Sequence, residues 1–177
     1  NPELRGVGER CVVGFGSSGG PPMMNVLYNN HYQIVQSPGY VMIMAEMVHD
    51  ARIIRLDGKH PPENITPWLG DSIGHWEGNT LVVETTNFNP QHTFRGGLRH
   101  FFAITSGAIV TERFTRISKD QILYRFYVDD PDIYSQVWAG EMPLRSVEGK
   151  IYEYACHEGN YSMANILAGA REEEKRR

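Results

Sequence analysis

Short runs in which apolar and polar residues alternate occupy the middle of the chain. The clearest run, Gln121–Val128, places large apolar side chains on one face of an extended chain, as a strand buried on one side requires. They are Ile122, Tyr124, Phe126 and Val128. Comparable strand signals are found in Tyr32–Gln36, Tyr40–Val48, Arg52–Leu56, His75–Trp76, Thr80–Asn87, Ile109–Ile117, Gln121–Val128, Ile133–Trp138 and Ile151–Cys156. The pattern predicts a mostly β protein.

Turn-forming residues separate these runs. Examples are Ser37-Pro38-Gly39, Glu77-Gly78-Asn79 and Ser118-Lys119-Asp120, which are typical of tight hairpins. Consecutive short strands joined in this way favour a single closed antiparallel β-barrel, because closure removes exposed sheet edges. A β-sandwich is the alternative.

The two ends of the chain carry different signals. Residues 1–29 are rich in glycine and proline and show no periodic pattern, so we expect an extended leader packed on the barrel. The barrel domain then covers residues 30–177. Helix-forming residues are confined to its end, which predicts one short C-terminal helix near residues 162–171, followed by a charged tail.

Composition narrows the possible partners. A chain of 177 residues with 41% hydrophobic content is long enough for one core. The net charge is −4 and no basic face is visible, so we expect no nucleic-acid partner. No apolar run approaches the ~18 residues of a membrane-spanning helix, and we expect a soluble protein without a membrane span. The pattern predicts no particular oligomeric state.

The two cysteines and the first residue bear on location. Cys11 and Cys156 match no CxxC or zinc spacing, and a disulfide between them is favoured over two buried free thiols. The chain starts at Asn1 without an initiator methionine, which indicates a removed signal peptide, although a cloning boundary looks the same. Together these features predict a periplasmic or secreted protein.

Several motifs resemble a large family of secreted bacterial lipocalin-like proteins, most of which have no assigned role. The resemblance is carried by residues 68–72 and 76–89, and it continues in 49–54, 112–116, 130–131 and 153–161. It implies export and a lipocalin-like barrel.

The segment Gly96–Gly107 departs from that family, because aromatic and aliphatic residues replace a short polar stretch. The segment indicates a pocket for an apolar ligand. The chain also resembles the small, cofactor-free α-pinene oxide lyases. That resemblance implies a lyase or isomerase that opens a small hydrophobic, terpene-like epoxide by acid–base chemistry. The alternative is a non-catalytic periplasmic carrier of small apolar ligands or lipids, which needs the same barrel and no acid–base pair.

Candidate catalytic residues lie where the apolar run 40–45 becomes polar. His49 is able to exchange a proton near neutrality, and Asp50 would orient it. His100 beside Phe101 is the second candidate for the proton donor or acceptor. The alternative for Glu46, His49, Asp50 and Arg52 is a structural salt-bridge network that closes the barrel end.

Candidate substrate-binding residues are apolar or aromatic. Flexible methionines adapt to rounded apolar ligands as readily as to gaps in a core, and aromatic faces stabilise a cation. The set is Met42, Met44, Phe101, Phe102, Tyr124 and Tyr127.

We expect no metal and no cofactor. His75 and Glu77 share one strand face, but zinc needs three or four ligands. Glu112 and Arg113 point to opposite faces of their strand, so one of them is expected to find a barrel-closing partner such as Glu153.

Overall fold

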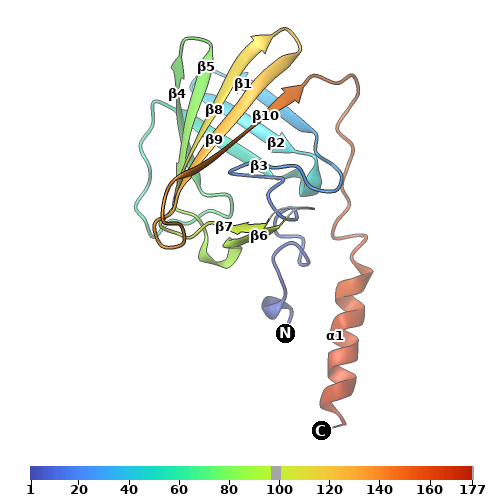
Figure 1. Ribbon diagram of the computed structural model, residues 1–177. Helices are drawn as coiled ribbons and strands as arrows, with labels where there is room; N and C mark the ends of the chain where they lie inside the picture. The colour runs from blue at the N-terminus through green and yellow to red at the C-terminus, as the bar shows by residue number, and fades with distance from the viewer. Residues whose placement is uncertain (97–100, 177) are drawn as a thin grey trace.

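The protein folds around one large curled β-sheet that forms a half-barrel (Figure 1). The computed structural model describes residues 1–96 and 101–176. The sheet has eight strands in the order β1-β2-β3-β4-β5-β8-β9-β10. They are β1 (Tyr32–Ser37), β2 (Tyr40–Ala45), β3 (Ala51–Leu56), β4 (Asp71–Glu77), β5 (Thr80–Thr86), β8 (Ile109–Ser118), β9 (Gln121–Asp129) and β10 (Trp138–Arg145). The prediction of a mostly β protein is confirmed.

The sheet differs from a closed antiparallel barrel in two respects. Strands β3 and β4 pair in parallel, because residues 57–70 return the chain to the end of the sheet at which β3 began. Strands β1 and β10 are the two edges of the sheet in the described residues, so the predicted closure is not confirmed. The half-barrel instead keeps an open seam.

The inner face of the sheet carries the hydrophobic core. The alternation predicted for Gln121–Val128 is confirmed, since Tyr124, Phe126 and Val128 are buried in the core and Ile122 packs against it. The cross-strand register continues the same face into β8 and β5, where Phe114 pairs with Tyr124 and Leu81 pairs with Phe114. The core therefore lies inside the curl of the sheet.

The first 31 residues contain no strand, and their second half enters the curl of the sheet. Met23 is 1% exposed and belongs to the central core cluster. Ser17 and Ser18 are fully buried, and the Tyr32 hydroxyl donates to the backbone oxygen of Ser18 at 2.8 Å. This segment supplies part of the interior that the strands alone leave open.

Two predicted strands near the C-terminal end are wrong. Residues 133–137 form turn and loop, and the strand runs instead from Trp138 to Arg145, while residues 151–156 join no ladder. The sequence pattern does not predict β10, because the strand contains Gly140 and Pro143 and neither residue type favours strands. Pro143 is tolerated because β10 is an edge strand. The short pair β6 (Phe94–Gly96) and β7 (Phe101–Ala103) was not predicted.

Gly140 gives a first test of the packing. A Cβ on Gly140 would lie 2.5 Å from Cζ of the buried Phe126 ring, which has no room to move in the core. We expect Gly140→Ala to lower the free energy of unfolding by about 1 to 3 kcal/mol, as overpacking does. Gly169→Ala is the control, because nothing lies within 4 Å of that position. Urea unfolding measures both, and equal stabilities would contradict the packing of β9 against β10.

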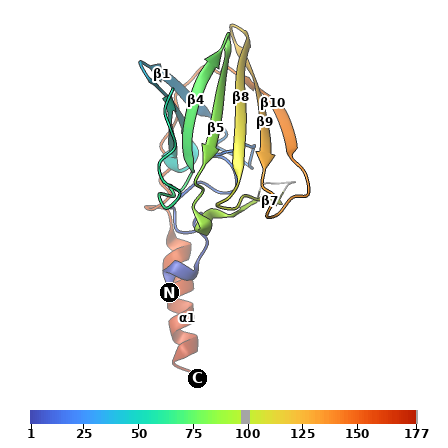
Figure 2. The same cartoon turned by 90° about the vertical axis from the view of Figure 1, so that its left-hand side faces the viewer.

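The predicted C-terminal helix is confirmed as α1 (Tyr161–Glu174). The Asn160 side chain caps it by accepting from the backbone N–H of Met163 at 3.2 Å. No residue of α1 is buried, and the helix extends away from the sheet (Figure 2). In the described residues, no helix combines the length and apolar character needed to cross a membrane.

Candidate ligand-binding site

An apolar pocket of about 400 Å³ lies at the hairpin end of the half-barrel. Its wall comes from residues of strands β1, β2, β4, β5, β8 and β9, near the turns that join β1 to β2, β4 to β5 and β8 to β9. The lining residues are Ile34, Gln36, Val41, Ile43, Trp76, Asn79, Leu81, Phe114, Arg116 and Ile122. The pocket thus combines an aliphatic and aromatic wall with a few polar groups near the turns.

A buried hydrogen-bonded ion pair lies directly beyond this wall. Arg52 is the cross-strand partner of Ile43, and it donates from Nη1 and Nη2 to the two carboxylate oxygens of Glu112 at 2.5 and 3.1 Å. Tyr124 donates to Oε1 of Glu112 at 2.6 Å. All three side chains are at most 2% exposed. Each of these side chains neighbours a residue that lines the pocket, either as its cross-strand partner or two positions away on the same face of a strand. The network therefore forms a polar layer beside the pocket.

Burial and mutual attraction determine the charges of this polar layer. Burial alone would lower the pKa of Arg52, but the Glu112 carboxylate outweighs it and holds that pKa above its ordinary value. Burial raises the pKa of Tyr124 well above the usual 10.0, and Glu112 adds to the effect. At neutral pH the layer therefore contains the guanidinium of Arg52 and the neutral phenol of Tyr124.

A second buried arginine lies near the same network. Arg95 is 0% exposed, and its Nη1 donates to the backbone oxygen of Gly20. Its guanidinium carbon lies 5.7 Å from the centroid of the Phe88 ring, a cation–π contact. Nε and Nη2 of Arg95 are buried without a hydrogen-bond partner among the described residues. Unsatisfied buried donors of a charged group cost more than about 1 to 3 kcal/mol, so they call for an explanation.

The charge of Arg95 has no dedicated counterion among the described residues. Burial is the main cause that lowers the pKa of Arg95 to about 9, and repulsion by Arg52 adds to it, while Glu112 acts in the opposite direction. Burial, followed by the charge of Arg95, lowers the pKa of His92 to about 4, so His92 is neutral at physiological pH. In the described part of the chain, this region of the interior therefore holds two guanidinium groups and the carboxylate of Glu112.

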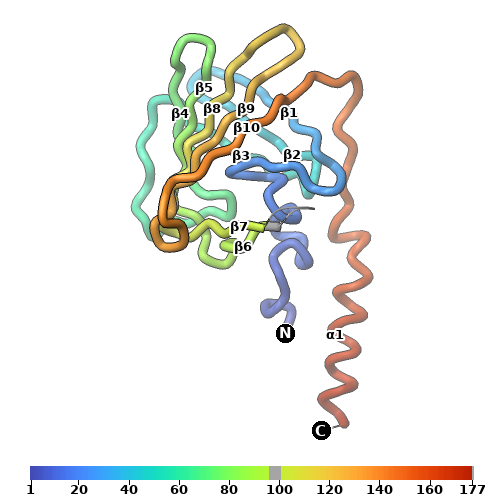
Figure 3. The backbone as a smooth tube through the Cα atoms, in the orientation of Figure 1, coloured from blue at the N-terminus to red at the C-terminus, as the bar shows by residue number. Residues whose placement is uncertain are grey.

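The predicted group of Glu46, His49, Asp50 and Arg52 is dispersed by the fold. Val48 and His49 both have positive φ, 59° and 54°, which turns the chain sharply between β2 and β3. Buried Glu46 contacts His31, with 2.7 Å between Oε2 and Nδ1, and this contact is the main cause that lowers the pKa of Glu46. Of the four residues, Arg52 is the one that joins the polar layer. His49 is exposed and lines a separate groove with residues 147–152. The backbone tube in Figure 3 shows the segment after β10 passing beside β1 and β2.

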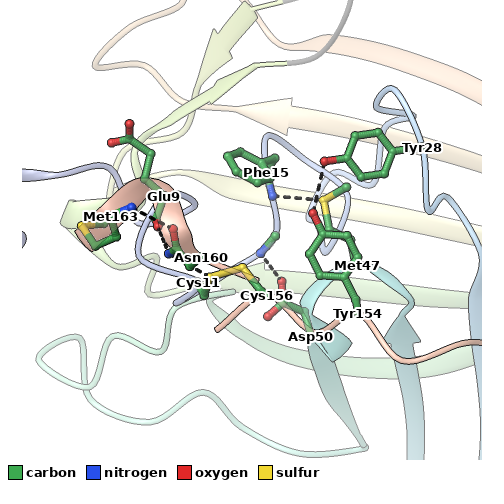
Figure 4. The surroundings of a disulfide bond; sticks show 11 residues. Glu9, Cys11, Phe15, Tyr28, Met47, Asp50, Tyr154, Cys156, Asn160 and Met163 are labelled. Carbon is green, nitrogen blue, oxygen red and sulfur yellow. Dashed lines mark hydrogen bonds between the residues drawn. A yellow bond between two sulfur atoms is a disulfide. The ribbon is translucent and has the colours of Figure 1, made fainter. Parts of the chain in front are cut away.

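Asp50 is held by the N-terminal segment beside the disulfide (Figure 4). Its Oδ2 accepts from the backbone N–H of Gly14 at 2.6 Å. Burial raises the pKa of Asp50, and this hydrogen bond partly offsets the effect. The predicted disulfide between Cys11 and Cys156 is confirmed, with a Cα–Cα distance of 5.7 Å. Asp50 thus anchors a loop that the disulfide also holds.

The predicted substrate-binding residues are dispersed over the two faces of the large sheet and the short β6–β7 pair. Tyr124 is in the polar layer, and Phe102 is buried against Trp138, with ring centroids 5.5 Å apart. Phe101 is 72% exposed and stacks on Phe94.

Met42, Met44 and Tyr127 do not line the pocket either. Met42 and Met44 alternate with the inward-facing Val41 and Ile43, and Tyr127 pairs with Thr111 on the outer face. His100 lies outside the described residues. Met42 and Met44 were predicted to bind substrate from their residue type alone. The alternation of side chains along β2 places them on the outer face.

Other ionisable pairs are structural. In the described residues, no group of three or more metal-ligating side chains occurs. His75 and Glu77 lie together on the outer face, where Glu77 also accepts from Arg113 at 2.7 Å. Glu112 and Arg113 do point to opposite faces, but Glu112 binds Arg52, and Arg113 binds Glu77 and not the exposed Glu153.

Sequence reasoning missed Arg95 and the role of Glu112. The signal for Glu112 was present, because alternation places it on the same face as Val110 and Phe114. The same alternation places Arg52 on the face of its strand that also carries Ile54. The sequence therefore contains two opposite charges, Arg52 and Glu112, on otherwise apolar strand faces. Nothing local marks Arg95, which lies in a strand of three residues.

No family model, no curated protein and no solved structure matches this chain.

Proposed function

We propose that the protein binds a small apolar ligand in the half-barrel pocket and carries it without converting it. The observation that carries the proposal is the lining of the pocket. Its wall is built mainly from Ile34, Val41, Ile43, Leu81, Phe114 and Ile122. Among the described residues, the lining contains Arg116 and no histidine, carboxylic acid, tyrosine or cysteine side chain. Such a site favours binding over acid–base chemistry.

The opening of a terpene-like epoxide remains the second prediction. That chemistry needs a proton donor that touches the ligand. His49 is exposed on a different groove, and Asp50 is bonded to Gly14. Tyr124 is inside the curl, but its hydroxyl already donates to Glu112. These contacts favour the carrier over the lyase.

We also propose an extracytoplasmic location, periplasmic or secreted. The disulfide between Cys11 and Cys156 supports it, because such bonds persist mainly in oxidising compartments. A carrier of apolar ligands has an evident use there, since apolar molecules cross an aqueous compartment poorly without a binding protein.

Filling the pocket tests the carrier. Ile122→Trp adds bulk to the lining on β9, and we expect it to weaken binding of 1-decanol by at least about tenfold, or 1.4 kcal/mol. Displacement of the dye N-phenyl-1-naphthylamine measures the affinity. Ile117→Trp is the matched control, because Ile117 is 52% exposed and does not line the pocket. Equal affinities of both variants and the native protein would contradict the assigned pocket.

The same preparation distinguishes carrier from lyase. Incubation of the native protein with α-pinene oxide, followed by gas chromatography, should return the epoxide at the rate of its spontaneous decay. Protein-dependent product that disappears in Ile122→Trp and persists in Ile117→Trp would replace the carrier with an enzyme.

A further inference from the structure

A histidine–carboxylate pair lies in the groove that residues 147–152 form beside the first two strands. His31 directly precedes β1 and Glu46 directly follows β2, so they continue the register in which Tyr32 pairs with Ala45. The backbone N–H of Glu46 donates to the backbone oxygen of His31 at 2.9 Å, and Oε2 of Glu46 lies 2.7 Å from Nδ1 of His31. Both residues line the groove, whose volume is about 620 Å³. The backbone pairing and the side-chain contact together hold the imidazole ring in place.

The two partners differ in exposure, as a base and the group that orients it do. The side chain of Glu46 is 4% exposed, while that of His31 is 56% exposed. The hydrogen bond with His31 is the main cause that lowers the pKa of Glu46, so Glu46 is ionised at neutral pH. An ionised carboxylate only accepts hydrogen bonds, so Nδ1 carries the proton of the neutral His31 ring and the lone pair is on Nε2. Among the described residues Nε2 has no hydrogen-bond partner, so it is able to accept a proton from a molecule in the groove.

The rest of the groove lining favours a small ester as the substrate. Met44, Val147 and Ile151 offer apolar contacts, and Lys150 adds a positive charge. Positive charge stabilises the oxyanion that forms when water attacks a carbonyl group. An ester suits a site that supplies a base, because its alcohol or phenol oxygen leaves more readily than the nitrogen of an amide, which must first be protonated.

We propose that His31 and Glu46 form a second site, in which His31 is the general base for the hydrolysis of a small carboxylic ester and Glu46 positions it. Nε2 of His31 takes a proton from water while the water oxygen forms a bond to the carbonyl carbon. The ester C–O bond then breaks, and the leaving oxygen takes the proton from Nε2. The products are one carboxylic acid and one alcohol or phenol. This activity goes beyond the carrier function, and the groove shares no lining residue with the apolar pocket.

Phenyl butyrate tests the proposal, because its hydrolysis releases phenol, which is followed by ultraviolet absorbance. We expect the native protein to hydrolyse it with saturation kinetics and faster than free imidazole at the same concentration. His31→Gln should lower kcat/KM by about 100- to 10,000-fold, the range of a positioned acid–base group, because glutamine keeps a donor for Glu46 but takes no proton. His75→Gln is the matched control, because the side chain of His75 is also 56% exposed and contacts a glutamate, but it does not line the groove. It should retain full activity, and equal activities of the two variants would contradict the role of His31.

Two measurements on the native protein cover the case in which His31→Gln does not fold. The ¹⁵N chemical shifts of the neutral His31 ring should place the proton on Nδ1, as the contact with Glu46 requires. Hydrolysis should be slower in heavy water than in ordinary water, because a proton moves as water attacks the ester. A proton on Nε2, equal rates in the two solvents, or a native rate no higher than that of free imidazole overturns the inference. These outcomes are independent of 1-decanol binding, which tests the carrier separately.

Discussion

Glu112→Gln is expected to lower the free energy of unfolding by about 3 to 5 kcal/mol, the usual cost of removing one partner of a buried ion pair. The substituted amide would keep the shape of the side chain but leave Arg52 without its counterion. The loss should be at the upper end of this range, because Arg95 already contributes an uncompensated charge nearby. Urea unfolding monitored by tryptophan fluorescence measures the difference.

Arg52→Met removes the other partner of the ion pair, so comparing it with Glu112→Gln tests the surplus positive charge of the interior. It leaves Glu112 with the hydroxyl of Tyr124 and the attraction of Arg95, so we expect a smaller loss than for Glu112→Gln. Pairing Arg52→Met with Glu112→Leu should recover part of the stability, as apolar replacements of buried pairs often do. If Arg52→Met lowers the free energy of unfolding by more than Glu112→Gln does, the interior does not carry the surplus positive charge assigned to it.

Loss of the disulfide is expected to have a comparable effect. Cys11 and Cys156 are separated by 145 positions, and the chain-entropy estimate for so long a loop is about 4 to 5 kcal/mol. We therefore expect the double variant Cys11→Ser with Cys156→Ser to unfold at a much lower urea concentration. The disulfide constrains nearly the whole unfolded chain, so the effect should appear in global unfolding.

Chemical reduction of the native protein provides the control. Reduced protein should match the double serine variant in stability, because both lack the same constraint. Mass analysis of the untreated protein should find no thiol that reacts with an alkylating agent. Two alkylated cysteines, or a serine variant as stable as the native protein, would show that the bond does not stabilise the fold.

Strand periodicity is enough to predict most of the sheet. It places Tyr124, Phe126 and Val128 on the buried face because side chains alternate with a period of two. Periodicity fails at β10, where Gly140 is required by the Phe126 ring, a contact between neighbouring strands that no local pattern shows. It also cannot tell whether the last strand meets the first, since closure depends on the accumulated curl of the whole sheet.

The candidate site is predicted less well than the fold. Proximity in sequence groups Glu46, His49, Asp50 and Arg52, but two successive residues of positive φ send them to different surroundings. The disulfide is predictable because only two cysteines exist and they match no metal or redox spacing. The position of the disulfide beside Asp50 and Gly14 is not predictable from the sequence.

Local periodicity, propensity and residue count are sufficient to predict the strand content, the inward face of the longest strands, the C-terminal helix and the cysteine pair. The contact between Arg52 and Glu112 and the unpaired edge of Arg95 among the described residues depend on the folded chain. Those contacts join segments distant in the chain, and the relative positions of such segments are determined by the packing of the sheet around the N-terminal segment.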